Sequence, residues 1–275
     1  MKISYMTYSK ISQWYDLSED VIVLTGAAGK LGKHYANAFL EANAKVALFD
    51  ASQEALDEYV SNLEESHRQN VLSIVCDISN KEEVIDSFDK VKNTFGNCSI
   101  LINNAAAVQV TFLEGSLVDF EDFPIEVWKS NLDVNLTGAF LCCQEAGKHM
   151  LEREKGVILN ISSIYGVVGC DQRIYGDSGL NSNIAYAATK SGLINFTRYL
   201  ASYWQGKNIR VNCLSPGGVY NNQPDEFFNN YTEKTMLKKM SEPEDLVSAI
   251  LYLVSDASGM VTGINHLVDG GYTAW

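Results

Sequence analysis

Short runs of hydrophobic residues alternate with longer amphipathic segments from residue 21 to the end of the chain. Several of the short runs are almost continuously apolar, which is typical of strands that helices cover on both faces. The pattern predicts seven parallel strands, at VIVLTG (21–26), KVALFD (45–50), VLSIVC (71–76), SILINN (99–104), GVILNIS (156–162), IRVNCL (209–214) and INHLVDGG (264–271).

The segments between these runs carry helical spacing and start signals. Asn80 precedes Glu83 by three residues, the spacing of a capping box, and an apolar stripe follows over 84–95. Ser241 and Glu244 repeat that signal before another apolar stripe. Strand–helix alternation without a repeat or a linker predicts a single-domain α/β Rossmann fold, with a doubly wound seven-stranded parallel sheet and helices on both faces.

Two stretches interrupt this alternation. Residues 164–184 are rich in Gly, Asp, Asn and Ser, and residues 216–240 are polar and Asn-rich. Each follows a predicted strand and so lies at the carboxyl edge of the sheet, where ligands bind in open α/β folds. We therefore expect an N-terminal extension over 1–18 and one domain over 19–275 with these two stretches as lid loops.

Composition and charge exclude several classes of protein. The chain has 275 residues, of which 46% are hydrophobic and 20% charged, as in an ordinary globular protein. Its net charge of −13 argues against nucleic-acid and anionic-membrane partners, because binding phosphate needs a basic surface. No secretory signal or spanning segment is visible, and the six cysteines lack C-x-x-C spacing, so we expect a cytoplasmic protein with free thiols. The four histidines form no ligand pattern, so no catalytic metal is expected.

A glycine-rich string, GAAGKLG at 26–32, joins the first predicted strand to a helix. Glycines permit a tight turn there, and the helix N-terminus offers unpaired N–H groups to a pyrophosphate. The next strand ends in Asp50, whose carboxylate can accept hydrogen bonds from ribose hydroxyls and would repel a 2′-phosphate. Asp50 could instead be an ordinary cap, and Lys30 could meet a phosphate. The direct charge opposition at Asp50 favours NAD, with NADP less favoured.

Tyr186 and Lys190 lie four residues apart at the start of a helical segment, so both side chains share one helix face. An unperturbed tyrosine titrates near pKa ~10 and is a poor base at neutral pH. A nearby ammonium favours the phenolate and lowers that pKa. The same spacing is common by chance on surface helices, so the pair needs support from other motifs.

That support comes from a set of motifs in order along the chain. They are Asp16-Leu17-Ser18, Asp77 after the third strand, Asn103-Asn104-Ala105-Ala106, Asn135-Leu136-Thr137-Gly138, Asn160-Ile161-Ser162-Ser163, Pro216-Gly217 and Val268-Asp269-Gly270-Gly271. With them the chain resembles the short-chain dehydrogenase/reductase family from about residue 16 to residue 271. The resemblance implies hydride transfer between a nicotinamide and a substrate alcohol or carbonyl carbon.

The resemblance also implies roles for four residues. Tyr186 would be the general acid/base, and Lys190 would bind the nicotinamide ribose and lower the pKa of Tyr186. Ser163 would orient the substrate oxygen, and Asn135 would hold a water that links Lys190 to solvent. The expected cofactor-binding residues are Gly26, Gly29, Lys30, Leu31, Gly32, Asp50, Asp77, Ile78, Asn104, Ala105, Tyr186, Lys190, Pro216, Gly217 and Val219. The expected substrate-binding residues are Ser163, Arg173, Tyr186 and Asn221.

The sequence departs from the family pattern in three places. Lys30 stands where the commonest glycine loop has its middle Gly, and the resulting spacing is more typical of the extended, sugar-nucleotide-modifying branch. Ser163 and Tyr186 are 23 residues apart, which is longer than usual and implies an enlarged lid. Asn221 stands where a Thr often follows the Pro-Gly motif, so the contact to the nicotinamide carboxamide stays open.

The lid loops suggest the class of substrate. They offer polar side chains and few long aliphatic ones, which predicts a small polyhydroxylated substrate such as a sugar derivative in surface-glycan biosynthesis; the polar ones are Gln172, Arg173, Tyr175, Asn221, Asn222 and Gln223. An NADPH-dependent 3-oxoacyl thioester reductase is an alternative that Asp50 and the acidic charge disfavour. A non-enzymatic dinucleotide sensor is another, and it would be expected to lack Tyr186 or Lys190. The resemblance further implies a homodimer or homotetramer.

Overall fold

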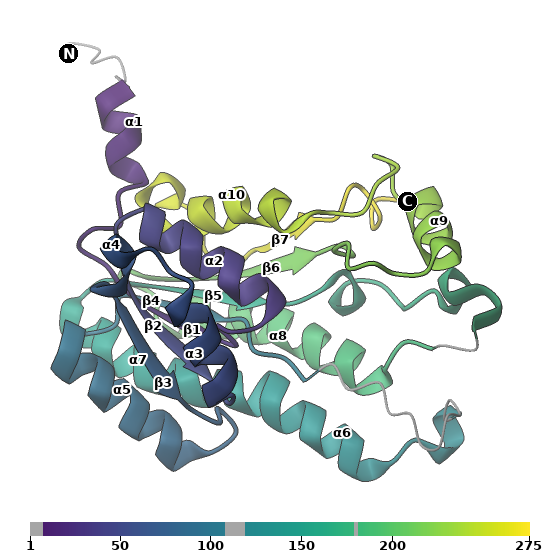
Figure 1. The fold of residues 1–275 in the computed structure, drawn as a ribbon, viewed down its shortest axis with the longest axis horizontal. Helices are drawn as coiled ribbons and strands as arrows, with labels where there is room; N and C mark the ends of the chain where they lie inside the picture. The colour runs from purple at the N-terminus through teal and green to yellow at the C-terminus, as the bar shows by residue number, and fades with distance from the viewer. Residues whose placement is uncertain (1–7, 108–118, 179–180) are drawn as a thin grey trace.

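The computed structural model of the protein describes residues 8–107, 119–178 and 181–275. Its centre is one seven-stranded parallel sheet in the order β3-β2-β1-β4-β5-β6-β7, with helices on both faces (Figure 1). This confirms the predicted doubly wound fold. Residues 1–7 of the expected extension and 179–180 of the first expected lid lie outside the described residues. The strands are β1 Val21–Thr25, β2 Lys45–Asp50, β3 Val71–Val75, β4 Ile100–Asn103, β5 Gly156–Ile161, β6 Ile209–Pro216 and β7 Asn265–Val268.

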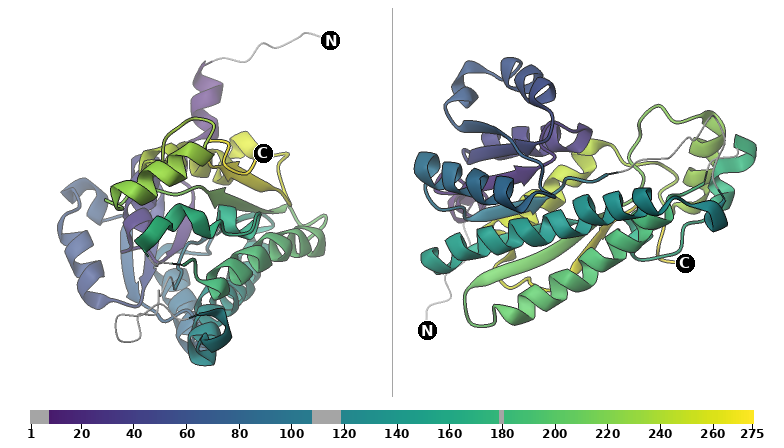
Figure 2. Two further views of the ribbon diagram at one scale, coloured as in Figure 1. Left: turned by 90° about the vertical axis from the view of Figure 1, so that its right-hand side faces the viewer. Right: turned by 90° about the horizontal axis from the view of Figure 1, so that it is seen from below.

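The helices fill the connections between strands. Figure 2 shows α6 and α7 running on through the π-helical turn η2 (Asp133–Gly138) as one long rod beside α8. None of the described helices is long and apolar enough to cross a membrane. The α-helices are α1 Tyr8–Trp14, α2 Lys30–Glu41, α3 Gln53–Ser61, α4 Glu65–Arg68, α5 Lys81–Phe95, α6 Ile125–Leu132, α7 Ala139–Arg153, α8 Ile184–Tyr203, α9 Asp225–Lys234 and α10 Pro243–Val254.

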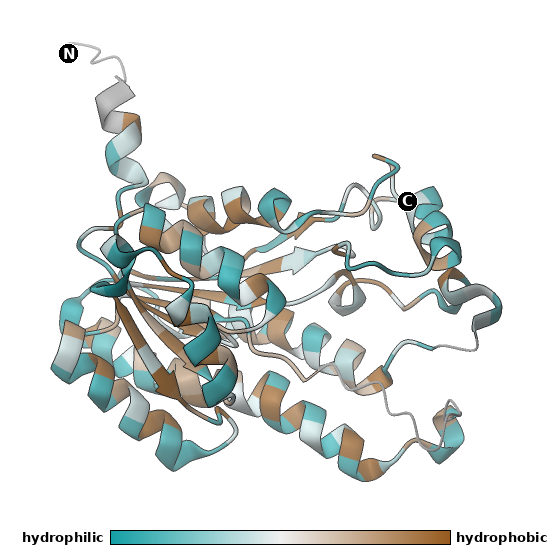
Figure 3. Cartoon of the chain, in the orientation of Figure 1, coloured by the Kyte–Doolittle hydropathy of each residue, from teal (hydrophilic) through white to brown (hydrophobic). Residues whose placement is uncertain are grey.

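Alternate side chains of β1 enter two separate cores, one on each face of the sheet. Ile22 and Leu24 pack with residues of α2, α3 and α10, whereas Val21 and Val23 pack with residues of α5, α7 and α8. Hydrophobic residues gather on the strands, while the outer helix surfaces are mostly hydrophilic (Figure 3). The nearly continuous apolar runs in the sequence therefore reflect burial on both faces of the central strands, whereas the edge strands β3 and β7 are partly exposed.

Helix starts follow local signals, with one correction. Asn80 caps α5 as predicted, because its Oδ1 accepts hydrogen bonds from the N–H groups of Glu82 and Glu83. Helix α10 begins one residue later than the sequence suggested, with Glu242 rather than Ser241 as its N-cap. Pro243 explains the shift, since proline favours the first helical position, where its missing N–H costs nothing.

Both stretches expected to be irregular lids contain short helices. The first holds the 3-10 turns η3 (Ile164–Gly166) and η4 (Gln172–Ser178), and the second holds α9. Helix α9 lies beyond the carboxyl ends of the strands, at the same end of the molecule as the C-terminus (Figure 1). The two stretches and the C-terminal residue Tyr272 share a small core, built from Ile164, Ile174, Tyr231, Met240 and Tyr272. The lids are therefore packed elements rather than open loops.

Candidate active site

The glycine loop after β1 leaves no room for side chains at two of its glycines. Gly26 has a φ of +62°, and a Cβ there would lie 2.7 Å from the Cα of Ala105. A Cβ on Gly32 would lie 2.2 Å from the carbonyl oxygen of Gly26. Gly29 is the N-cap of α2 and provides no side-chain cap, so first-turn N–H groups are free to bind an anion.

Asn104, just after β4, holds this loop in place. Its Nδ2 donates to the carbonyl oxygens of Thr25, at 3.0 Å, and Gly26, at 3.1 Å. The Thr25 hydroxyl in turn accepts hydrogen bonds from the N–H groups of Asn104 and Ala105. Because β1 and β4 are neighbours where the order of strands reverses, a ligand crevice is expected between their ends.

Asp50 ends β2 beside the same loop. Its Oδ2 accepts a hydrogen bond from the Ala28 N–H at 3.0 Å, and its Oδ1 accepts one from the Ser52 N–H at 3.1 Å. Asp77, after β3, is fixed in a similar way by Ser79, whose N–H and hydroxyl both donate to Asp77 Oδ1. Two oriented carboxylates therefore lie at this end of the crevice.

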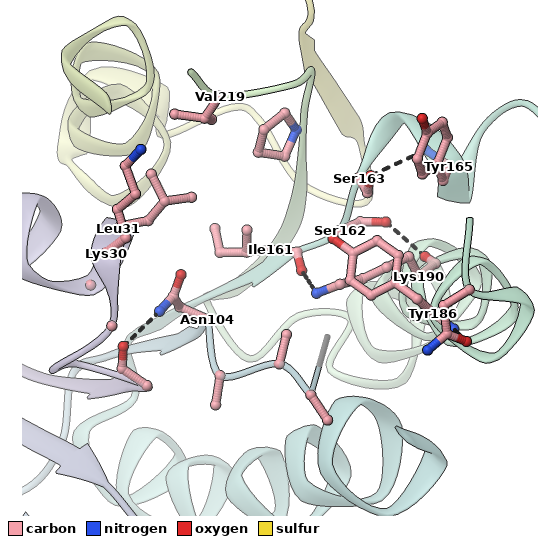
Figure 4. A pocket seen from close by; sticks show the side chains of 18 of the residues that line it. Lys30, Leu31, Asn104, Ile161, Ser162, Ser163, Tyr165, Tyr186, Lys190 and Val219 are labelled. Atoms are coloured by element: carbon pink, nitrogen blue, oxygen red, sulfur yellow. Dashed lines mark hydrogen bonds between the residues drawn. The ribbon is translucent and has the colours of Figure 1, made fainter. Parts of the chain in front are cut away.

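A cavity of about 860 Å³ runs from the glycine loop to the start of α8 (Figure 4). All fifteen residues that the sequence predicted to bind the cofactor line this cavity. So do three of the four residues predicted to bind substrate, namely Ser163, Tyr186 and Asn221. The tertiary structure thus gathers residues from the ends of β1, β2, β3, β4, β5 and β6 into one space.

Arg173, the fourth predicted substrate residue, lies elsewhere. Its side chain is 84% exposed and pairs with Asp171 at 2.8 Å, and it does not line the cavity. Asp171 also binds Lys234 of α9, and these two cations hold its pKa far below the usual range. Arg173 is therefore corrected from a substrate contact to part of an ion-pair cluster that joins η4 to α9.

Tyr186 is positioned by the first turn of α8. Asn183 caps this helix, and its Oδ1 accepts hydrogen bonds from the Ala185 and Tyr186 N–H groups. The hydroxyl of Ser163, which follows β5, interacts with the Tyr186 side chain and lowers the pKa of its phenol. Lys190, one turn further along, lies with its Nζ 5.4 Å from the centre of the Tyr186 ring. Three groups with possible roles in proton transfer thus meet at one end of the cavity.

The two neighbouring serines of this strand end do different things. Ser162 Oγ donates to the carbonyl oxygen of Lys190 at 2.7 Å, which ties β5 to α8. Ser163 Oγ accepts a hydrogen bond from the Tyr165 N–H (Figure 4), and the same side chain lowers the pKa of Tyr186. Of the two serines, Ser163 is therefore the one that acts on the pKa of Tyr186.

Burial dominates the acid–base properties of this group. Lys190 is 2% exposed and donates from Nζ to the carbonyl oxygen of Ile161 at 2.7 Å, and its burial lowers its pKa to about 8. Burial also raises the pKa of Tyr186, while the hydrogen bond from Ser163 lowers it. Ser163 therefore supplies an interaction that opposes the effect of burial on the pKa of Tyr186.

Asn135 lies in the π-helical turn η2 rather than in a regular helix. Its Oδ1 accepts a hydrogen bond from the Ala107 N–H at 2.6 Å, and its Nδ2 donates to the Ala107 carbonyl and to Thr189 Oγ1. The side chain does not line the cavity, and both of its donors are used. Asn135 therefore braces the chain after β4 against α8.

Several cavity residues were not expected from the sequence. Tyr165 lies two residues after Ser163, and Asn183 lies three residues before Tyr186. Phe227 and Tyr231 come from α9. The i, i+4 spacing of Phe227 and Tyr231 was the available signal for a helix within a stretch interpreted as a loop.

Comparison with known proteins decides the family. A family model described as enoyl-(acyl carrier protein) reductase matches residues 26–273. The chain belongs to the short-chain dehydrogenase/reductase family. The enzyme is therefore an oxidoreductase that acts on alcohol or carbonyl groups with a nicotinamide dinucleotide.

Individual relatives match the enzyme over nearly its whole length. It is 30% identical to a D-threitol dehydrogenase of Mycolicibacterium smegmatis, over 94% of this chain and 95% of that one. It is 30% identical to an NAD-dependent glycerol dehydrogenase of Listeria innocua, over 98% and 99%. A short-chain dehydrogenase of Leptospira borgpetersenii with bound NAD+ has 36% identity and a TM-score of 0.85 over 99% of both chains.

Proposed function

We propose that the enzyme is an NAD(H)-dependent dehydrogenase of small polyhydroxylated alcohols, with Tyr186 as general acid/base. The observation that carries this is the meeting of Tyr186, Ser163 and Lys190 in the same cavity as the glycine loop and Asp50. A dinucleotide fits the loop, because Gly26 and Gly32 permit a tight turn that brings the uncapped N-terminus of α2 to the cavity. Bound NAD supplies the hydride acceptor, and NADH the donor.

In this proposal Tyr186 exchanges a proton with the substrate oxygen, and Ser163 hydrogen-bonds the same oxygen and orients it. Lys190 lies beneath the tyrosine ring, where its ammonium can bind ribose hydroxyls and stabilise the phenolate that forms during oxidation. Asn135 acts through Ala107 and Thr189 as a positioning residue, because its side chain holds the chain after β4 against α8.

The choice of NAD rests on Asp50. Its carboxylate is held by two backbone N–H groups at the end of β2 and lines the cavity, so a 2′-phosphate placed there would meet a fixed negative charge. Lys30, the one cation that could offset this repulsion from the glycine loop, is engaged by the backbone of Tyr220 and by Asn221.

Replacing Asp50 by serine should shift the cofactor preference toward NADP. Repulsion between the Asp50 carboxylate and a neighbouring 2′-phosphate costs up to several kcal/mol of binding free energy, and the substitution removes it. The ratio of kcat/KM for NAD over that for NADP should therefore fall by about 10- to 100-fold. Steady-state kinetics with both cofactors measure this ratio. Asp57→Asn removes an equal charge from an exposed position on α3 and should keep the wild-type preference. An unchanged ratio in Asp50→Ser would remove Asp50 as the discriminating group.

A small substrate is favoured because the enlarged lid closes the cavity rather than opening it. Gly176 of η4 lies so near α9 that a Cβ would meet the Glu226 carboxylate at 1.9 Å. The rings of Tyr175 and Phe227 pack with centroids 5.3 Å apart across the same junction. A cavity of about 860 Å³ must hold the dinucleotide as well, which leaves limited room beside Tyr186.

The surface beside Tyr186 suits polyols. It combines aromatic rings, which pack against C–H groups, with hydroxyls and amides that bind several alcohol groups; the lining residues there are Tyr165, Tyr175, Asn181, Ser182 and Asn183. Dehydrogenases named for D-threitol and glycerol are among the relatives, which supports the same class.

Turnover on matched alcohols tests this proposal. With NAD, threitol or glycerol should give a kcat/KM at least about tenfold above that of 2-butanol, because each lost hydrogen bond to a buried partner costs about 1 kcal/mol or more. A nucleotide sugar tests the link to surface-glycan biosynthesis, and a 3-oxoacyl thioester with NADPH tests the reductase alternative. Activity confined to 2-butanol or to the thioester would overturn the polyol assignment.

We further propose a cytoplasmic homodimer or homotetramer. All six cysteines are free thiols, which suits a reducing compartment. Helices α7 and α8 expose large apolar side chains, namely Phe140, Leu151, Tyr199 and Tyr203. Such a surface favours pairing between copies of the chain.

A further inference from the structure

The side chain of Lys30 connects two loops on opposite sides of the cofactor cleft. Its Nζ donates to the carbonyl oxygen of Tyr220 and, at 3.0 Å, to Oδ1 of Asn221. Tyr220 and Asn221 are 190 and 191 residues away from Lys30 in the sequence. Figure 4 shows Lys30 reaching from the glycine loop toward the segment that carries Val219. Lys30 and Asn221 both line the cavity, so their contact lies over the space that a dinucleotide would fill.

The loop that Lys30 meets has a hydrogen-bonded frame of its own. Gln223 Oε1 accepts from the Asn221 N–H at 2.6 Å, and Gln223 Nε2 donates to the Val219 carbonyl at 3.0 Å. The Tyr220 N–H donates to the carbonyl of Ser241 at 2.8 Å. These bonds hold Asn221 at the tip of a short braced turn, so Lys30 meets a preformed acceptor.

The same turn is packed against the lid. The Tyr220 ring meets that of Phe228 edge-on, with centroids 5.8 Å apart. Phe228 belongs to α9, which lines the substrate end of the cavity with Phe227 and Tyr231. A movement of residues 219–223 would therefore change contacts both with α9 and with the glycine loop.

The charge of Lys30 points to an anion in the cleft. Lys30 is the first residue of α2, where the helix dipole is already positive and a cation is unfavourable. None of the ion pairs among the described residues includes Lys30. A pyrophosphate at this helix end would neutralise the excess charge, so the cation is best accommodated when a dinucleotide is bound.

We propose that Lys30 is a latch that holds residues 219–223 over the bound cofactor and thereby slows its release. A glycine, the family's commonest residue at this position, has no side chain that could reach Asn221, so the latch follows directly from the departure noted in the sequence. When the contacts of Lys30 open, the turn can move away and the dinucleotide can leave. The latch concerns exchange of the cofactor and does not depend on which alcohol is oxidised.

Release of NADH measures the latch without any substrate. In stopped-flow displacement of NADH from the intact enzyme by excess NAD+, Lys30→Met and Asn221→Ala should each raise the release rate by about three- to tenfold. The double variant should release NADH no faster than the faster single variant, because both substitutions break one contact. Lys33→Met removes the same charge one turn further along α2, at a side chain that does not line the cavity, and should release NADH at the wild-type rate.

Three outcomes would overturn the latch. Additive effects in the double variant would mean that Lys30 and Asn221 act independently. A faster release in Lys30→Met with no change in Asn221→Ala would mean that Lys30 acts on the cofactor alone. Equal effects of Lys33→Met and Lys30→Met would mean a general effect of charge. All three outcomes are measured as rates of NADH release without substrate. A failure to find polyol turnover would therefore not affect them.

Discussion

Replacing Tyr186 by phenylalanine is expected to lower turnover by about a thousandfold while leaving NADH binding largely intact. A positioned general acid/base contributes about 10²- to 10⁴-fold, and Tyr186 is the hydroxyl that Ser163 and Lys190 surround. The substitution removes one oxygen atom and keeps the ring that packs near Lys190. Steady-state kinetics and NADH fluorescence titration measure the two effects separately.

Tyr199→Phe is the matched control for this experiment. Tyr199 belongs to the same helix but does not line the cavity, so loss of its hydroxyl should leave kcat and KM unchanged. Ser163→Ala should give an intermediate loss of about 10- to 100-fold, because the tyrosine then loses its hydrogen-bonding partner. Near-normal turnover in Tyr186→Phe would show that another group moves the proton.

The pH dependence should follow from the same environment. Burial raises the pKa of Tyr186, so the phenol is protonated at neutral pH and suited to donate a proton to a carbonyl oxygen. Oxidation of an alcohol needs the phenolate, and its rate should therefore rise with pH. Lys190 carries its charge only up to its own pKa of about 8. Above that pH it no longer stabilises the phenolate of Tyr186.

Replacing Lys190 by methionine is expected to abolish most turnover and yet stabilise the protein at neutral pH. Turnover should fall by about 100-fold or more, because the cation beneath the tyrosine is lost. The ammonium is 2% exposed with one hydrogen-bond acceptor, and a pKa lowered from 10.5 to about 8 corresponds to about 3 kcal/mol of unfavourable burial. Loss of the bond to Ile161 offsets part of this, which leaves a gain of about 1–2 kcal/mol.

The gain should depend on pH in a defined direction. Between pH 8 and 10.5 the unfolded chain holds a proton on Lys190 that the folded protein has released, so the wild-type protein gains stability as the pH rises. The advantage of Lys190→Met is therefore largest near pH 7 and small above pH 10. Urea unfolding across this range measures the difference in free energy of unfolding. Lys207→Met, an exposed control, should show no such trend, and a less stable Lys190→Met at pH 7 would contradict the account.

Local patterns predicted the elements whose signals are short-range. The apolar runs identified all seven strands, and Asn80 identified the start of α5. The lid was harder, because the polar composition of 216–240 concealed α9, whose Tyr231 is buried in a cluster with residues from distant segments, among them Ile174 and Tyr272. Helix α10 shifted by one residue because Pro243 prefers the first helical position.

The sequence by itself determined the fold, the reaction class and the residues that line the cofactor end of the cavity. These depend on periodicity, on glycines where no Cβ fits, and on motifs that each sit at the end of one strand. Only the tertiary structure decided how those residues divide their work: that Arg173 pairs outside the cavity, that Asn135 braces the chain around Ala107, and that Lys30 reaches Asn221. Lys234, which joins the ion pair of Arg173, and the partners of Asn135 and Lys30 are distant in sequence, so these contacts form only when the sheet, α8 and the lids are packed.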